Sequence, residues 1–366
     1  MKRIGIQLLL FSLFLTSLLS CSKDDNYIAV DDDPIAESPV VLDLAQVPYD
    51  KLSEYNFFSG DMKEQNPVLG VLPFEPISSL FTDYAKKKRF VWMPKNSKAT
   101  YQGDGTILDF PVGTALIKTF YYENVQPSNS KKIIETRLMI KKQTGWIFAN
   151  YVWNENQTEA LLDNQGSFVD LSWLEAGQPK QTTYRIPSEA ECLTCHKKSD
   201  NPIPIGPKPQ NLNSLYTYSD GSKNQLAKWI EMGYLDGSNV PGNIESMVKW
   251  NDASQPLELR VRSYIDINCA HCHAENSHCD YRPIRLAFNE TSNPTNLGIC
   301  VTPDEFINSS LSYIIAPGNY QRSALHYRLT TNEENLRMPL MGRSMVHQEG
   351  VEMIEEWINS LTQVCN

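Results

Sequence analysis

After its first twenty residues the sequence has no apolar run long enough to cross a bilayer, and it has little concentrated positive charge. A membrane-spanning helix needs roughly 20 apolar residues, which none of the later stretches provides. The formal charge is -10, and the one basic cluster is KKKR at residues 86–89. We therefore expect no nucleic acid as partner, because nucleic-acid binding requires a concentrated basic surface.

The beginning of the chain, MKRIGIQLLLFSLFLTSLLSC, has two basic residues followed by an apolar run that ends at Cys21. This pattern is typical of a lipoprotein signal peptide over residues 1–20, with cleavage before Cys21 and a lipid anchor attached to it. Residues 21–40 are acidic and poor in core-forming residues, which indicates a flexible tether. We expect an exported lipoprotein of the outer membrane that faces the periplasm or the cell surface.

Residues 41–186 contain neither cysteine nor histidine, and their hydrophobic pattern is that of strands. Residues 134–141 alternate between the two faces of a strand, and QTG at residues 143–145 predicts a turn into WIFANYVWN. We expect a β-rich domain over this range. Metal chemistry must then belong to the half of the chain that follows it.

Two segments of that half repeat the pattern C-x-x-C-H, at Cys192, Cys195 and His196 and again at Cys269, Cys272 and His273. With 8 cysteines and 6 histidines in 366 residues, chance would supply roughly 0.003 such pentapeptides. Cysteines three positions apart on a helical turn reach the two vinyl groups of one haem, and the adjacent histidine then faces the iron. The sequence therefore predicts two c-type haems, with His196 and His273 as proximal ligands.

Zinc and disulfides are the alternatives to haem. The two C-x-x-C pairs together offer four zinc ligands, but that interpretation leaves the histidine after each pair unexplained. A thioredoxin-like redox motif needs a βαβ context, which the pattern lacks. We expect His271 and His278 at the surface. Export permits a disulfide between Cys279 and Cys300, which leaves Cys365 as an odd thiol.

A cytochrome c haem ordinarily takes a methionine or a histidine as its sixth ligand. For the second haem we expect Met338, because Pro339 holds the following loop extended, and Met341 is its rival. For the first haem the sequence leaves four candidates, Met232, Met247, His326 and His347. If none of them binds, that iron is open to peroxide or another small ligand.

With these residues, the chain resembles a family of bacterial dihaem c-type cytochromes that have an N-terminal β domain. The matching stretches are LFTDYAKKKRF, FPVGTALIKTF, IETRLMI, ECLTCH, NCAHCH and RMPLMGRS, which extend over most of the chain. The resemblance implies electron transfer outside the cytoplasm, proximal ligation by His196 and His273, distal ligation of the second haem by Met338, and a C-terminal module similar to a small class I cytochrome c.

The expected fold is therefore multidomain, with an N-terminal all-β domain followed by mainly α-helical cytochrome c-like haem modules. The first haem module would cover residues 187–252 and the second residues 253–366. Helical patterns in PLELRVRSYIDIN and EGVEMIEEWINSL place apolar residues on a single stripe, which favours helices in the second module.

Three functions are compatible with the sequence. The first is an electron carrier for redox protein partners with basic surfaces, since this chain is acidic, with Arg337 and Arg343 pairing with haem propionates. The second is a haem enzyme such as a peroxidase, which requires an open first iron. The third is a docking lipoprotein whose β domain binds a partner through Trp146, Tyr151 and Trp153.

Overall fold

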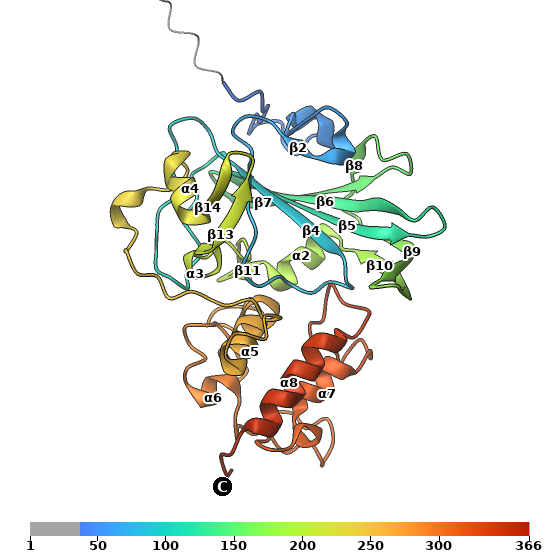
Figure 1. The fold of residues 1–366 in the computed structure, drawn as a ribbon, viewed down its shortest axis with the longest axis vertical. Helices are drawn as coiled ribbons and strands as arrows, with labels where there is room; N and C mark the ends of the chain where they lie inside the picture. Colours follow the sequence, from blue (N-terminus) through green and yellow to red (C-terminus); the bar gives the residue numbers. More distant parts are fainter. Residues whose placement is uncertain (1–36, 366) are drawn as a thin grey trace, which may run out of the picture. The chain divides into compact units, whose positions relative to one another are not determined.

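A computed structural model describes residues 37–365 of the chain (Figure 1). The expected signal peptide, the lipid-anchored Cys21 and the tether up to residue 36 lie outside these residues. Within the described range, no helix combines the length and the apolar character that crossing a membrane requires.

An antiparallel eight-stranded sheet contains all the strands between residues 72 and 186. Its main path runs β10-β9-β5-β6-β7-β8, while β4 pairs with β5 and β3 pairs with β4. The strands are β3 (Leu72–Pro73), β4 (Lys86–Trp92), β5 (Ala115–Val125), β6 (Ser130–Lys142), β7 (Gly145–Trp153), β8 (Ala160–Leu162), β9 (Ser167–Glu175) and β10 (Gln178–Ile186). In the β6–β7 hairpin Lys142 is opposite Gly145, which confirms the predicted turn.

The sheet has two different faces, because successive side chains along a strand point in opposite directions. On one face Phe90, Ile117 and Leu138 lie in cross-strand register and join an apolar cluster with residues from the 47–71 segment. On the other face, Met139 belongs to a cluster that includes Trp229 of α4 (Gln225–Glu231). Both faces are therefore covered by other parts of the chain.

The expectation of an aromatic docking surface on this domain is wrong. Trp146, Tyr151 and Trp153 of β7 are 7%, 0% and 6% exposed, respectively. Since the sheet is covered on both faces, large aromatic side chains on a central strand contribute to the core instead of to the surface.

The expectation of mainly α-helical cytochrome c-like modules after the β domain is also wrong. The described part of residues 187–366 contains short hairpins and seven α-helices, of which the longest has 13 residues. Prolines account for much of the low helix content, since proline cannot continue a helix and restricts the residue before it. They recur in NPIPIGPKPQ, at residues 201–210, and again at positions 283, 294, 303 and 317.

Two helices of the C-terminal part match the predicted stripes and lie side by side (Figure 1). Val261 and Ile265 of α5 and Ile354 and Trp357 of α8 belong to one apolar cluster. The helices are α2 (Glu189–Cys195), α3 (Pro209–Leu212), α4, α5 (Leu257–Ile265), α6 (Pro294–Leu297), α7 (Ala324–Thr330) and α8 (Gln348–Ser360). The remaining strands are β1 (Phe58–Ser59), β2 (Asn66–Pro67), β11 (Lys197–Lys198), β12 (Asn201–Pro202), β13 (Leu215–Tyr218) and β14 (Gly221–Asn224).

Five short helical segments of other types complete the described elements. They are η1 (Leu52–Tyr55), η2 (Met62–Glu64), η3 (Gly237–Asn239), η4 (Asp266–Ala270) and η5 (Tyr320–Arg322). Of these, η4 is a π-type turn that continues α5 directly into the second C-x-x-C-H motif.

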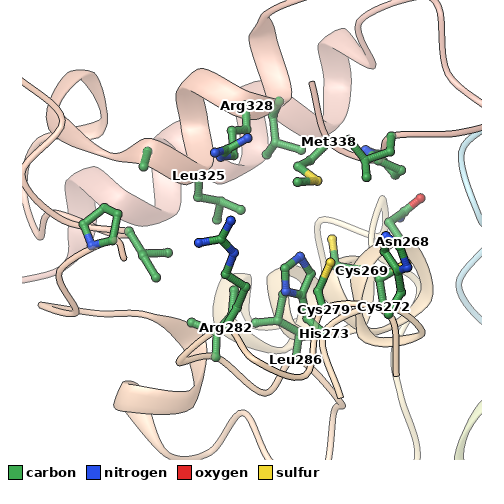
Figure 2. A pocket seen from close by; sticks show the side chains of 18 of the residues that line it. Asn268, Cys269, Cys272, His273, Cys279, Arg282, Leu286, Leu325, Arg328 and Met338 are labelled. Atoms are coloured by element: carbon green, nitrogen blue, oxygen red, sulfur yellow. The ribbon is translucent and has the colours of Figure 1, made fainter. Parts of the chain in front are cut away.

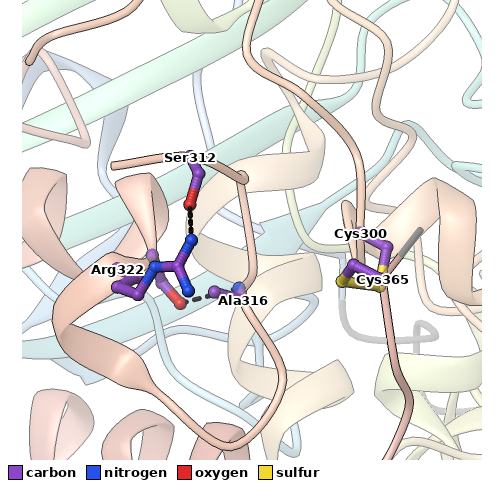
Figure 3. Close-up of a disulfide and its surroundings, with 6 residues drawn as sticks. Cys300, Ser312, Ala316, Arg322 and Cys365 are labelled. Atoms are coloured by element: carbon purple, nitrogen blue, oxygen red, sulfur yellow. Dashed lines mark hydrogen bonds between the residues drawn. A yellow bond between two sulfur atoms is a disulfide. The ribbon is translucent and has the colours of Figure 1, made fainter. Parts of the chain in front are cut away.

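The disulfide joins Cys300 to Cys365, with a Cα–Cα distance of 5.2 Å (Figure 3). The expected Cys279–Cys300 pair is therefore wrong. Cys279 is a free thiol, 5% exposed, and its amide donates to the carbonyl of Cys272 at 2.9 Å. That bond holds Cys279 in the turn after the second motif, while the C-terminal tail brings Cys365 to Cys300.

Candidate functional site

The two C-x-x-C-H motifs have the same local backbone geometry. The amide of His196 donates to the carbonyl of Cys192 at 2.9 Å, and that of His273 donates to Cys269 at 3.0 Å. The first motif ends α2, whose first turn is held by a bond of 2.9 Å from the Ser188 amide to a side-chain oxygen of Glu191. Each histidine is thus fixed one helical turn after the first cysteine of its own motif.

The two motifs lie side by side in the fold. The sulfur atoms of Cys195 and Cys272 and a ring nitrogen of His271 all lie within 4.8 Å of one another. The Cys272 thiol also reaches the carbonyl of Thr194, at 3.5 Å. His271 and Cys272 are only partly exposed, so the expectation of a solvent-facing His271 is wrong. Sequence spacing carried no signal for this contact, because it is a long-range one.

A large cavity, with a volume of about 460 Å³, adjoins the second motif. Cys269, Cys272 and His273 line one side of it, and Met338 projects into it from the segment after α7 (Figure 2). Apolar side chains such as Leu286 complete much of the wall. The structure therefore brings together the four residues that the sequence predicted for the second haem.

His278 is exposed, as expected, and it lies at the wall of this cavity. Two arginines that sequence reasoning missed, Arg282 and Arg328, also line it. Arg282 lies 3.4 Å from Asp304 and 3.3 Å from Glu305. Arg328 is half-buried, and desolvation lowers the pKa of its guanidinium. The guanidinium groups that line the large cavity are therefore that of Arg282, which already has carboxylate partners, and that of Arg328.

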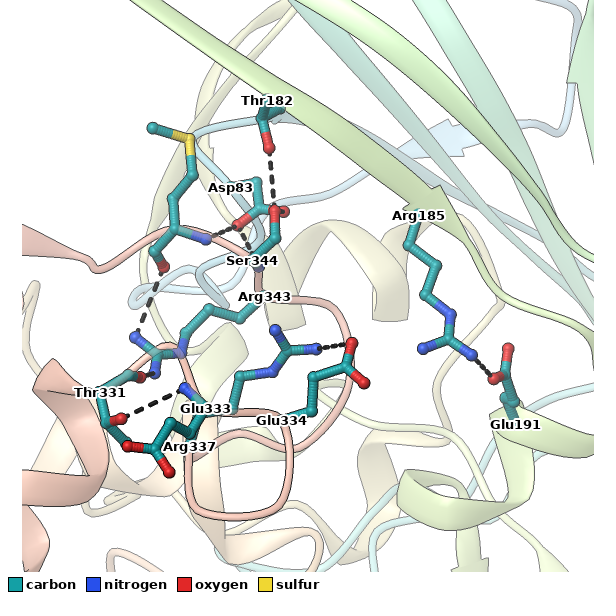
Figure 4. A network of polar contacts seen from close by, with 11 residues as sticks. Asp83, Thr182, Arg185, Glu191, Thr331, Glu333, Glu334, Arg337, Arg343 and Ser344 are labelled. Carbon is teal, nitrogen blue, oxygen red and sulfur yellow. Dashed lines mark hydrogen bonds and ion pairs between the residues drawn. The ribbon is translucent and has the colours of Figure 1, made fainter.

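The arginines that flank Met338 in the sequence do not line either cavity, in the part of the chain that the structure describes. Arg337 forms an ion pair of 3.6 Å with Glu334 (Figure 4). Arg343 donates to the carbonyl of Leu329 at 2.8 Å. The expected contacts with haem propionates are therefore wrong. The guanidinium of Arg343 instead ties its own loop to the end of α7.

A small cavity of about 140 Å³ adjoins the first motif and the sheet. Cys192, Cys195 and His196 line it together with residues of β4 to β7. The His196 Nδ1 atom lies 2.9 Å from the carbonyl of Ile203, and its ring centroid is 5.5 Å from that of Phe148. A bond from Nδ1–H to a carbonyl leaves Nε2 as the free lone pair, which is the arrangement of metal-binding histidines.

Met341 also lines the small cavity. The four ligands considered from the sequence do not line it among the described residues, namely Met232, Met247, His326 and His347. His326 instead bonds Glu355 at 2.7 Å, and His347 bonds the hydroxyl of Tyr264 at 2.9 Å. Met341, expected as the rival of Met338, thus belongs to the other cavity.

One segment, which we call the methionine loop (residues 337–345), supplies a methionine to each cavity. Its far end is held by the Asp83 carboxylate, which accepts bonds from the Ser344 amide at 2.8 Å, the Ser344 hydroxyl at 2.7 Å and the Met345 amide at 2.8 Å (Figure 4). Asp83 is 3% exposed, and hydrogen bonds to an ionised carboxylate are stronger than those between neutral groups. The loop is thereby fixed to the segment between β3 and β4.

Burial controls the protonation of these groups. Desolvation lowers the pKa of His196 and of His273 to about 4, so both imidazoles are neutral at neutral pH. It raises the pKa of Cys192 to about 11 and that of Cys269 to about 12, so both are thiols at neutral pH. Contact with the Cys272 thiol and His271 lowers the pKa of Cys195, and the same contact raises the pKa of Cys272.

No family model matches the chain, and no match is found among curated proteins or solved structures. The resemblance to dihaem c-type cytochromes therefore stays a prediction that rests on the motifs. The cluster of Cys195, His271 and Cys272 has the geometry of a partial metal site. A structural zinc site is closed by four ligands, and this cluster provides three.

Proposed function

We propose that the protein is a dihaem electron carrier, exported as a lipoprotein through Cys21. The observation that carries the proposal is the pairing of each C-x-x-C-H motif with a cavity into which one methionine of the methionine loop projects. Cys192, Cys195 and His196 would hold one haem with Met341, while Cys269, Cys272 and His273 would hold the other with Met338. When bound, each haem supplies one-electron redox chemistry.

The donor set fits covalently attached haem at both motifs. Each has two thiols for thioether bonds and a neutral histidine, and His273 has a buried Nδ1 atom with no partner among the described residues. The large cavity falls within the range of roughly 300–1,000 Å³ that ligand sites occupy, whereas the small one, at about 140 Å³, is below it. Side chains that line the small cavity must move apart to seat a haem.

Two features support a carrier in preference to an enzyme. Met341 lines the cavity of the first motif and would serve as a sixth ligand there, so that neither iron would need an open position. The adjacent sulfurs of Cys195 and Cys272, within 4.8 Å, place the two attachment points side by side. An electron that enters at one cavity then has a short path to the other. The acidic chain favours a redox partner with a basic surface.

The test is to export the chain from a host that attaches haem outside the cytoplasm and to measure covalent haem per chain by mass spectrometry. We expect two haems, and one in either double variant, Cys192→Ser/Cys195→Ser or Cys269→Ser/Cys272→Ser. The matched control is Cys279→Ser, which removes a nearby free thiol and should keep both haems. A haem-free protein that contains stoichiometric zinc would contradict the proposal.

A further inference from the structure

A row of three cations and one amide crosses the sheet on the face toward the small cavity. Arg89 of β4 is directly opposite Lys118 of β5, which is opposite Arg137 of β6, which is opposite Asn150 of β7. All four line the small cavity. We call Arg89, Lys118 and Arg137 the cation row.

The cation row separates two apolar regions of the same sheet face. On one side of the row, two positions away along each strand, lie Val91, Leu116 and Met139, which belong to one apolar cluster. On the other side of the row, two positions from Lys118 along β5, lies Phe120, which belongs to a different apolar cluster. Since like charges on facing positions repel and burial makes them costly, this placement needs a compensating negative charge.

The carboxylates of the chain near the row have other partners. Glu191, which lines the small cavity, pairs with Arg185, and Glu189 of the same wall is exposed and accepts a bond of 3.3 Å from Asn164. Glu135 is already used, because its carboxylate pairs with Arg137 at 2.5 Å and accepts a bond of 2.6 Å from the Tyr184 hydroxyl.

Arg89, 8% exposed, and Lys118 have no ion-pair partner among the residues described, and the Lys118 ammonium lies 4.8 Å from the centroid of the Phe120 ring. Desolvation lowers the pKa of Arg89 to about 10 and, together with the neighbouring arginines, lowers that of Lys118 well below its ordinary value.

Uncharged groups beside the cation row also lack partners. Both side-chain amide atoms of Asn150 and the hydroxyl oxygen of Thr82 are buried without a hydrogen bond in the described part of the chain. Asn150 and Thr82 are each 5% exposed, and both line the small cavity. Buried polar groups without partners are rare, and where they face a cavity they indicate a ligand that satisfies them.

We propose that the cation row binds carboxylates, and that these are the two propionates of the haem carried by Cys192 and Cys195. The inference rests on the proposed function. Two unpaired cations, Arg89 and Lys118, match two propionates in number. Because the row and the thiols line the same cavity, a haem attached at one side directs its opposite edge, which carries the propionates, toward the other groups of the wall. Asn150 and Thr82 then donate to the same oxygens.

The experiment measures the reduction potentials of both haems in the holoprotein and in Lys118→Met. Loss of the cation destabilises the reduced haem, so the reduction potential of the first haem should fall by about 59 mV. This shift corresponds to a tenfold fall in the ratio of reduced to oxidised first haem at a fixed potential. The second haem is the internal reference. Lys88→Met is the matched control, because Lys88 lies on the opposite face of the sheet, across from Thr119. Lys118→Arg keeps the charge and should restore the wild-type potential.

An equal shift in Lys118→Met and Lys88→Met would overturn the inference, even with two haems present. A wild-type chain without haem at the first motif would instead refute the proposed function. A free anion could supply the same negative charge as the propionates. This alternative is tested by adding acetate or inorganic phosphate to the holoprotein. If either anion stabilises the holoprotein saturably, and does so only when Lys118 is present, the row holds a free anion and the propionate assignment is wrong.

Discussion

The two cavities contain the same pentapeptide and a methionine from the same loop, yet their walls differ. The large cavity is built from the segments around α5 to α7, and its Arg282 already has carboxylate partners. The small cavity is built partly on the sheet, where the cation row has few partners of its own. Identical attachment chemistry is thus placed in a loop-built site and in a sheet-built one.

This difference shows which part of the molecule is expected to tune each haem. In the large cavity, loops and rim charges that reach solvent set the environment, whereas the sheet holds the charges of the small cavity in fixed register. The reduction potential of the first haem should therefore depend on the buried cations, and that of the second haem on how far the haem is exposed to solvent.

The largest expected effect comes from exchanging the methionines one at a time. Met338→Ala should remove the methionine–iron charge-transfer band of the second haem, and Met341→Ala that of the first, with two haems kept in each variant. Each change should lower the potential of the haem concerned, since a methionine ligand raises it. Optical and EPR spectra of the purified variants check this.

The control for the methionine exchange is Met345→Leu, on the same loop. Met345 contacts an apolar cluster and lines neither cavity among the described residues, so both signatures should persist. If Met338→Ala abolished both signatures, or Met341→Ala neither, the assignment of one methionine to each cavity would be wrong.

Removing the disulfide should affect the loop-built site more than the sheet-built one. Cys365→Ser opens a loop with a sequence separation of 65, whose closure is worth about 4 kcal/mol. Chemical denaturation should show a loss of this size, and hydrogen exchange should increase around α5 to α8 with the sheet unchanged. Cys279→Ala, which removes a buried free thiol that closes no loop, should lose much less stability than Cys365→Ser. If hydrogen-exchange protection were lost equally over the sheet and around α5 to α8, the disulfide would not stabilise the loop-built site selectively.

Acid should weaken the wall of the small cavity through His347. His347 is 9% exposed and stacks on Phe81, which lines that cavity, with ring centroids 4.1 Å apart. Desolvation lowers its pKa from 6.5 to about 4, a shift that Glu349 opposes and that Lys87 and Lys180 reinforce. The neutral form therefore stabilises the fold above pH 6.5, and this stability is lost as the pH falls towards 4.

At pH 5 the expected loss is about 2 kcal/mol relative to pH 7. His347→Gln removes the titrating group, so the stability advantage of the wild type over the variant should shrink by about 2 kcal/mol between pH 7 and pH 5, and further by pH 4. Denaturation of both proteins from pH 7 to 4 measures this difference. Parallel pH profiles would show that His347 does not control the acid sensitivity.

Several local features were predictable from the sequence. The alternation at residues 134–141 and the turn at residues 143–145 depend on neighbours a few positions away, and the β6–β7 hairpin forms there. The stripes on α5 and α8 were predictable for the same reason. Helical content after residue 186 was overestimated, because the prolines that interrupt it outweigh the periodicity between them.

By itself, the sequence determined the two C-x-x-C-H motifs, the strand pattern and Met338 as a candidate ligand, since these depend on short-range spacing and residue type. Only the tertiary structure decided that Cys300 pairs with Cys365, that Met341 belongs to the first motif's cavity, and that Arg89 and Lys118 face each other on the sheet. Such contacts join residues far apart in the chain. Packing and strand register create them, and no local pattern records which distant residue will be the partner.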